Sequence, residues 1–227
     1  MIPPLIVETA LALGINLIAI TDHNSTANIQ AVQKAASGTD LHVLPGMELQ
    51  TREDIHSLCL FDTLEQVNEL QVKVDHTLPT IKNQPEHFGE QFVVDETGEF
   101  IRREERLLIT SSSLSLNEAF DLVTGLGGLF IPAHINRKTF GLIESLGFIP
   151  PEIPFPAVEI SRHITCEQAR KQIPGIRDIP IIQNGDVHRL NEFLGSLELY
   201  INSPTVDEIR FALNNKNGRS FTVLNIK

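Results

Sequence analysis

Acidic and histidine side chains recur in this 227-residue sequence directly after short apolar runs. Asp22 and His23 follow the run 17–20, and His134 follows 129–133. Short runs rich in β-branched residues are typical of strands that are buried on both faces. Imidazoles and carboxylates bind Zn, Mn or Fe. Because catalytic groups of α/β barrels gather at the C-terminal ends of the strands, these side chains predict a metal site with several ions.

The same pattern returns near the C-terminus, where Asp186 and His188 follow the run 179–183. Residues two apart in an extended segment point to the same side, so both side chains can reach one site. This spacing is a moderately specific signal for paired ligands.

Two further candidates are Glu48, just after the run 41–44, and His56, inside the run 55–61. Taken alone, each candidate has a plainer interpretation. Asp22 could cap a helix, Glu48 could be an exposed residue at a strand end, and His56 could be a hydrogen-bonded core histidine.

The elements that must position these residues alternate between strand and helix. Strands are predicted at 17–21, 41–44, 55–61, 129–133, 157–160, 179–183 and 197–201. Helices are predicted at 3–13, 25–36, 63–74, 115–126, 138–146, 165–172 and 205–214. This alternation predicts parallel β/α units in a single domain, 1–227.

A polar stretch, 78–108, interrupts the alternation. Asp95-Glu96-Thr97-Gly98 lies between two short β-like runs and predicts the turn of an inserted β-hairpin. Long insertions of this kind often form lids or binding loops, so we expect no second domain here.

Composition and charge limit the classes of partner. The chain is 41% hydrophobic and 21% charged, as is usual for a globular protein. Its 29 acidic and 18 basic residues give a net charge of −11, which makes long nucleic acid a less favoured partner. Trp is absent and a single Tyr is present, so a stacking platform for bases is not expected.

No apolar run approaches a membrane span of ~20 residues, and no signal peptide is evident. We therefore expect a cytoplasmic protein without a membrane partner.

Together these motifs resemble the PHP (polymerase and histidinol phosphatase) domain family over nearly the whole chain. The resemblance is carried by Thr21-Asp22-His23-Asn24, Pro45-Gly46-Met47-Glu48, His56 in its strand, Pro132-Ala133-His134 and Asp186-Val187-His188. It implies a distorted seven-stranded β/α barrel with up to three divalent metal ions at the C-terminal rim. It also implies that a metal-activated water hydrolyses a phosphate ester.

The resemblance implies a metal role for six residues: His23, Glu48, His56, His134, Asp186 and His188. Glu48 would bridge two ions, and His56 and His134 would complete one of these two positions. The ions would be Mn, Zn or Fe, two to three in a complete site of the family and fewer if ligands are missing.

The remaining ligands would complete the other positions. Asp186 would serve the second ion, and His23 and His188 would serve a third. Asp22 would orient the cluster or bind a metal directly. Asp22, His23, Glu48 and Asp186 are therefore the expected catalytic residues.

Three arginines lie just beyond predicted strand ends: Arg137, Arg162 and Arg189. A guanidinium group matches the geometry of a phosphate, so these residues are candidate substrate ligands. Equally, they could be solvated surface side chains. We expect the substrate to be a phosphorylated small molecule, a nucleotide or a short nucleic acid.

One part of the family pattern is missing. The family opens with a strand that carries a His-x-His pair, whereas no histidine precedes Leu17. We expect either that a preceding strand belongs to the natural protein or that the chain is a degenerate member of the family. A barrel without its first strand would have an open edge between 17–21 and 197–201, which a second copy of the chain could cover.

Two other functions compete with phosphate-ester hydrolysis. A non-catalytic or degenerate metal-binding module with a regulatory role would account for the missing His-x-His strand. A different α/β metallohydrolase, acting on an amide or ring substrate, would use similar ligands.

Overall fold

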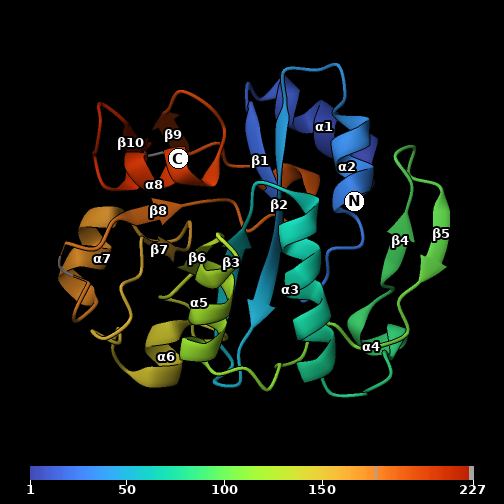
Figure 1. Cartoon of the computed structure of the whole chain (residues 1–227), viewed down its shortest axis with the longest axis horizontal. Coiled ribbons are helices and arrows are strands. Elements are labelled where there is room, and N and C mark those ends of the chain that lie inside the picture. Colours follow the sequence, from blue (N-terminus) through green and yellow to red (C-terminus); the bar gives the residue numbers. More distant parts are fainter. Residues whose placement is uncertain (177, 225–227) are drawn as a thin grey trace.

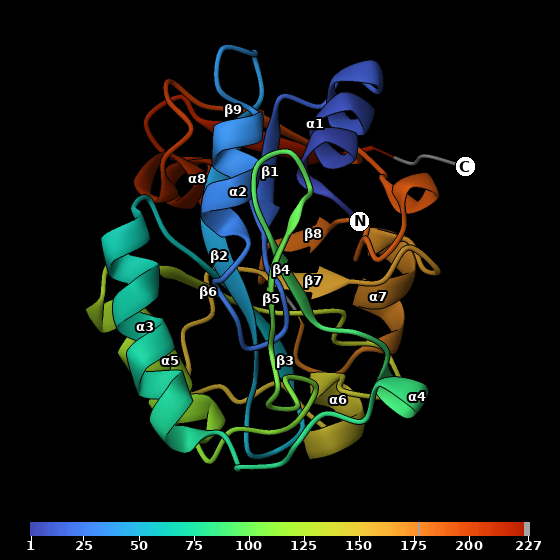
Figure 2. The same cartoon turned by 90° about the vertical axis from the view of Figure 1, so that its right-hand side faces the viewer.

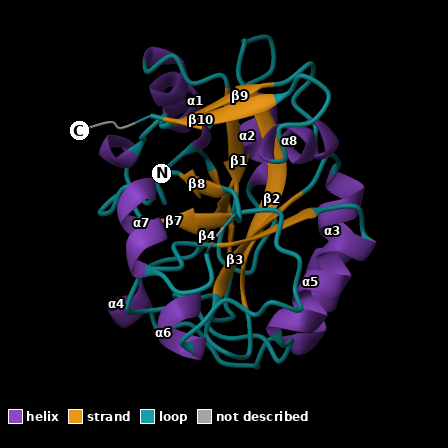
Figure 3. Ribbon diagram, turned by 90° about the vertical axis from the view of Figure 1, so that its left-hand side faces the viewer, coloured by secondary structure: helices purple, strands orange, loops and turns teal. Residues whose placement is uncertain are grey.

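The computed structural model describes residues 1–176 and 178–224 and shows a mixed α/β architecture (Figure 1). The helices are α1 (Pro3–Ala12), α2 (Ile29–Ala35), α3 (Leu64–Thr77), α4 (Pro85–Phe88), α5 (Leu116–Gly125), α6 (Leu142–Leu146), α7 (Cys166–Gln172) and α8 (Val206–Leu213), with a 3₁₀ turn at Leu190–Glu192. The strands are β1 (Leu17–Ile20), β2 (His42–Gln50), β3 (His56–Leu60), β4 (Phe92–Val94), β5 (Phe100–Arg103), β6 (Leu129–Pro132), β7 (Val158–Ile160), β8 (Ile181–Gln183), β9 (Leu197–Tyr200) and β10 (Ser220–Val223). Strands β1, β2 and β3 occupy the middle of the molecule, and most helices lie around them (Figure 3).

The largest sheet has the strand order β1-β2-β3-β6. β1 and β2 are parallel, whereas β3 is antiparallel to both β2 and β6. The prediction of uniformly parallel strands is therefore wrong for β3. Only residues 51–55 separate β2 from β3, which is too short for a parallel crossover and forces a reversal of direction. His56, at the start of β3, consequently pairs with Gln50 at the end of β2.

The other strands form three pairs within the described residues. β7 and β8 are parallel, β4 and β5 are antiparallel, and β9 is antiparallel to β10. β10 was not predicted, and it pairs with the segment that we expected to close the barrel. In the described part of the chain β1 pairs only with β2, so the closed seven-stranded barrel stays a prediction.

Alternate residues of the central strands enter two separate cores. Val43 and Phe130 belong to an outer core that α3, α5 and other helices cover, as Figure 1 shows for these two helices. Leu44 and Ile131 belong to an inner core that includes residues of α8. Successive side chains of a strand point to opposite faces, which explains this division. By the same alternation, Glu48 lies on the inner face between Met47 and Leu49, two residues of the outer core.

A cavity of about 1240 Å³ extends along the inner face. Its lining runs from Asp22 and Glu48, past Leu44 and Leu58, to Leu199 of β9. The inner face is thus apolar toward α8 and polar toward the opposite rim.

Helix starts were predicted well where a side-chain cap exists. Thr63, Ser115 and Thr165 each cap a helix with a capping box. The sequence predicts a cap at all three residues and the capping-box spacing at Ser115. The predicted helix 25–36 instead begins at Ile29, and its N-cap, Asn28, makes no capping hydrogen bond. Residues just before it continue beside β2, where the amide of Asn24 donates to the carbonyl of Glu48 at 3.0 Å.

The predicted helix 138–146 is also shorter and begins at Leu142. Residues 137–141 form a tight turn. The backbone at Gly141 comes so close to Arg137 that a Cβ atom at position 141 would lie 2.2 Å from the Arg137 carbonyl oxygen, so only glycine fits there. Phe140 in this turn has a positive φ of 60°.

The inserted hairpin is confirmed, with β4 and β5 at the outside of the molecule near α2 (Figures 1 and 2). Asn28 ties it to the rest of the fold. Its Oδ1 accepts from the Val94 amide at 3.1 Å, and its Nδ2 donates to the Phe92 carbonyl and to Asp22 Oδ2, each at 3.2 Å. The insertion is therefore held against the turn that carries Asp22.

Within residues 1–176 and 178–224, every helix is too short or too polar to cross a membrane.

Candidate metal centre

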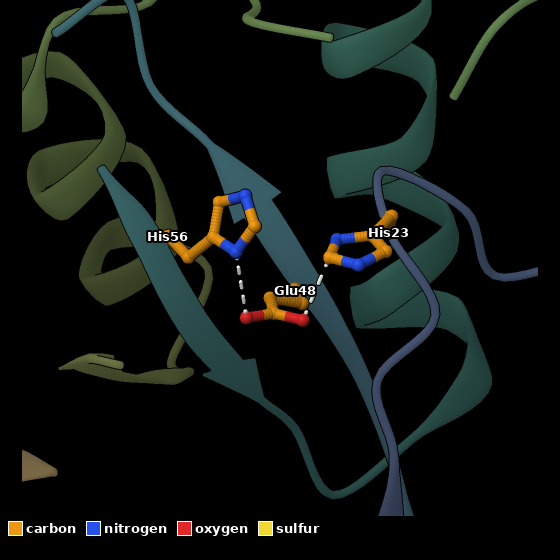
Figure 4. A group of neighbouring side chains, drawn as sticks. All are labelled: His23, Glu48 and His56. Carbon is orange, nitrogen blue, oxygen red and sulfur yellow. Dashed lines mark ion pairs between the residues drawn. The ribbon is translucent and has the colours of Figure 1, made fainter. Parts of the chain in front are cut away.

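The Glu48 carboxylate lies at the centre of a cluster of three imidazoles. His56 Nδ1 is 3.0 Å and His134 Nε2 is 3.2 Å from Glu48 Oε1. His23 Nδ1 is 3.4 Å from the other oxygen, Oε2; Figure 4 shows His23 and His56 on opposite sides of the carboxylate. A carboxylate whose two oxygens face different imidazoles has the arrangement of a bridging ligand.

Backbone pairing places His23 and His56 beside Glu48. The chain after β1 stays parallel to β2, so His23 forms a bridge directly with Glu48. The reversal between β2 and β3 brings His56 to the same rim although its strand runs the opposite way. His56 is therefore at the N-terminal end of its strand, and not in the interior of an apolar run as the sequence indicated.

His134 reaches the cluster from the turn after β6. Its φ is 30°, a left-handed conformation that is uncommon for residues other than glycine. The amide of Ala133 donates to the carbonyl of His56 at 2.9 Å, which joins this turn to β3. The His134 side chain is 2% exposed, so its imidazole is sealed within the fold.

The geometry and the chemistry of the cluster fit a divalent metal ion. Ligand atoms of Glu48, His23 and His56 lie within 4.8 Å of one another. Two ligands at about 2.1 Å from a tetrahedral ion lie about 3.4 Å apart, close to the separations observed here. His23 Nδ1, which faces Glu48, is a buried nitrogen without a hydrogen-bond partner, and such an orphaned atom is costly unless a ligand satisfies it.

The electrostatics of the cluster favour the protonation states that bind metal. Burial opposes the ionisation of Glu48, but hydrogen bonds from His134 and His56 outweigh it and hold the pKa of this carboxyl well below its usual range. Burial also lowers the pKa of His23 below its ordinary value. An ionised carboxylate beside a neutral imidazole can bind a cation without first losing a proton.

Asp186 and His188 lie next to His23 on the open side of the cluster. The rings of His188 and His23 have centroids 5.9 Å apart, and His188 Nδ1 is 3.5 Å from Asp186 Oδ1. Asp186 has a φ of 47° and forms an ion pair with Arg137 through its other oxygen. The structure thus gathers His23, His56 and His134 around Glu48 and places Asp186 and His188 on the side of His23.

The three candidate substrate arginines differ in their surroundings. Arg137 pairs with Asp186 beside the cluster. Arg162 donates to the carbonyls of Gly185 and Glu192, so its guanidinium fastens the loop after β8. Arg189 is exposed, and its backbone amide donates to the Glu192 carboxylate at 2.8 Å.

Sequence reasoning missed two residues of the site, Glu159 and Phe140. Glu159 lies on the inner face of β7, where burial raises its pKa to about 7. Its signal was a single acid between Val158 and Ile160, the same kind of pattern that singled out Glu48. The Phe140 ring stacks on His56 with centroids 4.4 Å apart and planes 5° from parallel, and no feature of the sequence announces this contact.

Comparisons with known proteins agree with this fold. No family model matches the chain. An uncharacterized protein of Streptococcus pneumoniae is 23% identical over 116 residues, which cover 42% of this chain and 43% of that protein. The lesion-specific endonuclease PfuEndoQ of Pyrococcus furiosus superposes with a TM-score of 0.69 at 20% identity, over 97% of this chain and 53% of the endonuclease.

A presumed metal-dependent phosphoesterase of Bifidobacterium adolescentis superposes with a TM-score of 0.56 at 18% identity, over 83% of this chain and 82% of that one. The chain therefore shares the fold of this phosphoesterase and of the endonuclease. It spans about half the length of the endonuclease and less than half of the pneumococcal protein.

One comparison weighs against an expectation from composition. An Endonuclease Q structure of the same fold, with a TM-score of 0.68, holds a 27-mer duplex with an abasic lesion at its active site. The preference for small substrates over long nucleic acid is therefore not a property of this fold, although the net charge of this chain still disfavours non-specific phosphate contacts.

Proposed function

We propose that this chain hydrolyses phosphate esters with the help of divalent metal ions held around Glu48. The observation that carries the proposal is the Glu48 carboxylate, whose two oxygens face His56 and His134 on one side and His23 on the other. Such a carboxylate suits two adjacent cations. The fold that the chain shares with a lesion-specific endonuclease and a metal-dependent phosphoesterase supports the same reaction class.

Each side chain has a defined task in this proposal. Glu48 would be shared by two ions, His56 and His134 would help to hold one of them, and His23, at the other oxygen, would help to hold the second. Asp186 and His188 extend the site toward solvent. When bound, divalent ions stabilise negative charge on phosphate oxygens and lower the pKa of a water toward neutrality.

Asp22 and Arg137 act on the open side of the proposed site. Asp22 accepts a hydrogen bond from Asn28, which holds its carboxylate near His23 as an orienting group. Arg137 forms an ion pair with the candidate ligand Asp186, and it would bind a substrate phosphate once a cation replaces it there. We propose Mn, Zn or Fe as the ion, and a phosphomonoester, a nucleotide or a short nucleic acid as the substrate.

The test compares wild-type protein with Glu48→Gln after removal of metal by a chelator. Hydrolysis of p-nitrophenyl phosphate, bis(p-nitrophenyl) phosphate and an oligonucleotide duplex is measured with and without Mn²⁺. We expect Mn²⁺-dependent activity in the wild type and at least about a 100-fold loss in the variant, because an amide cannot supply the bridging charge. Glu69→Gln, at an exposed position of α3, is the matched control and should keep full activity. Metal-independent activity, or an active Glu48→Gln protein, would overturn the proposal.

A second candidate function is a metal-binding module without catalysis. The ion pair between Arg137 and Asp186 favours it, because a guanidinium group already neutralises one candidate ligand. In that case calorimetry would detect Mn²⁺ binding while all three substrates stay intact.

A further inference from the structure

Glu159 is a buried carboxylate that lies beneath the two turns carrying His134 and Asp186. Its residue is 3% exposed, and its alternation on β7 directs it to the inner face, since Val158 and Ile160 both belong to the outer core. A buried carboxylate is costly unless hydrogen bonds satisfy it, so its contacts show what keeps it there.

The two carboxylate oxygens of Glu159 bind two different loops. Oε2 accepts a hydrogen bond from the backbone amide of His134 at 3.0 Å. Oε1 accepts from the side-chain amide of Asn184 at 2.9 Å, two residues before Asp186. The backbone carbonyl of Glu159 also accepts from the amide of Ile135 at 2.9 Å.

Both turns need such support because their backbones are strained. His134 has a φ of 30° and Asp186 a φ of 47°. Left-handed conformations of residues other than glycine cost free energy and persist only where neighbouring contacts impose them. Glu159 supplies a contact to the amide of the first turn and to the residue that opens the second.

We propose that Glu159 is a positioning residue that fixes His134 and Asp186 relative to each other by hydrogen-bonding both turns. Glu159 acts in this role through its hydrogen bonds to the His134 amide and to Asn184. The inference rests on the proposed metal site, because its consequence is the geometry of two of the site's ligands. Partners of this kind typically change metal affinity 10- to 100-fold.

The proposal is tested on the whole chain with three variants, and a fourth, Asn184→Ala, is the comparison if Glu159→Ala does not fold. Glu159→Ala removes both acceptors. Glu159→Gln keeps an acceptor for the His134 amide, and its own amide can donate to Asn184 after that side chain flips. Val158→Ala is the matched control, since it removes packing from the neighbouring buried residue on the opposite face of β7.

Two measurements are made on each variant. The first is hydrogen exchange of the His134 amide by NMR in metal-free protein. The second is the Kd for Mn²⁺ by calorimetry. We expect Glu159→Ala to accelerate exchange at least about tenfold and to weaken Mn²⁺ binding by about 10- to 100-fold. Glu159→Gln should stay within about threefold of wild type in both measurements.

Wild-type exchange and affinity in Glu159→Ala would overturn the inference, as would equal losses in Val158→Ala. If Glu159→Ala fails to fold, a Glu159→Gln protein that loses as much affinity as Asn184→Ala also overturns it. Failure of the proposed function has a different signature. In that case the wild type would bind Mn²⁺ without hydrolysing any ester, or it would bind no Mn²⁺ at all. Hydrogen exchange of the His134 amide is measured in metal-free protein, so it would still test whether Glu159 holds the turn.

Discussion

Glu48 concentrates the chemistry of the chain in one side chain. Its neighbours in sequence, Met47 and Leu49, are fully buried in the outer core, so its own side chain is forced to the inner face. Burial of an ionised carboxylate costs free energy unless opposite charges or donors surround it. Two imidazoles hydrogen-bond it and a third lies close, which explains how an acid can be retained at a 5% exposed position.

At this scale the sharpest prediction concerns His134→Ala. We expect the variant to lose metal-dependent hydrolysis at saturating Mn²⁺, while the metal-free protein still folds, with a free energy of unfolding about 1–3 kcal/mol below that of wild type. The loss arises because the buried Glu48 carboxylate loses its hydrogen bond from His134 Nε2, and the removal of His134 Nδ1, which is buried without a partner, offsets part of it. Activity assays and calorimetric melting check both parts.

The control for this variant is His42→Ala, at an exposed position at the start of β2, which should keep wild-type activity. Full hydrolysis by His134→Ala would remove His134 from the site. A large loss of metal-free stability would instead make it a core contact.

At the scale of the elements, the strained backbone conformations near the site lie in the connections between strands, whereas the side chains of the strands form the packed cores. Phe140 illustrates this division: its carbonyl accepts from the His56 amide at 3.1 Å while its ring stacks on the His56 imidazole. Its positive φ of 60° is unusual for a bulky residue and is imposed by the tight turn before α6. The turn therefore shapes the surroundings of a candidate ligand on another element.

Substitutions at Phe140 separate the ring from the backbone strain. Phe140→Ala should weaken Mn²⁺ binding by about 2- to 10-fold, because aromatic stacking contributes about 0.5–1.5 kcal/mol. Phe140→Gly loses the same ring but relieves the left-handed strain, so the metal-free Gly variant should be about 1 kcal/mol more stable than the Ala variant. Urea unfolding and calorimetry measure the two effects. Phe148→Ala, at a 52% exposed side chain, is the control. Wild-type affinity in Phe140→Ala, or an Ala variant more stable than Gly, would contradict this reading.

At the scale of the whole molecule, the metal-free protein combines a high negative charge with a large cavity beside the cluster. The chain carries a net charge of −11, and its inner face encloses a cavity of about 1240 Å³ that reaches the cluster. The sheets are held together by two cores rather than by a continuous ring of hydrogen-bonded strands in the described residues. Ligands from β2, β3 and the turns after β1, β6 and β8 meet at the rim. A bound cation would therefore add a further link between the four-stranded sheet and the turn after β8, which the Arg137–Asp186 ion pair already reaches.

Metal binding should accordingly stabilise the fold. With free Mn²⁺ at 100 times its Kd, the free energy of unfolding should rise by about 2.7 kcal/mol per site. For a chain of this length that corresponds to an increase in Tm of about 5–10 °C. Scanning calorimetry with Mn²⁺, with Mn²⁺ plus chelator, and with Ca²⁺ as a hard oxygen-preferring control would measure it. An unchanged Tm at saturating Mn²⁺ would contradict a folded-state metal site.

The amino-acid sequence by itself determined the strand runs, the capped helices and the candidate ligands, because periodicity and capping are local. The acids and histidines after apolar runs were visible for the same reason. Only the tertiary structure decided the antiparallel direction of β3, the partner of β9, and the contacts of Glu159 and Phe140. These depend on how distant segments meet: a short connection reverses β3, and Glu159 joins two turns that lie far apart in sequence. Local sequence patterns identify the side chains that can bind a metal, whereas the packing of distant segments determines which of their atoms face one another.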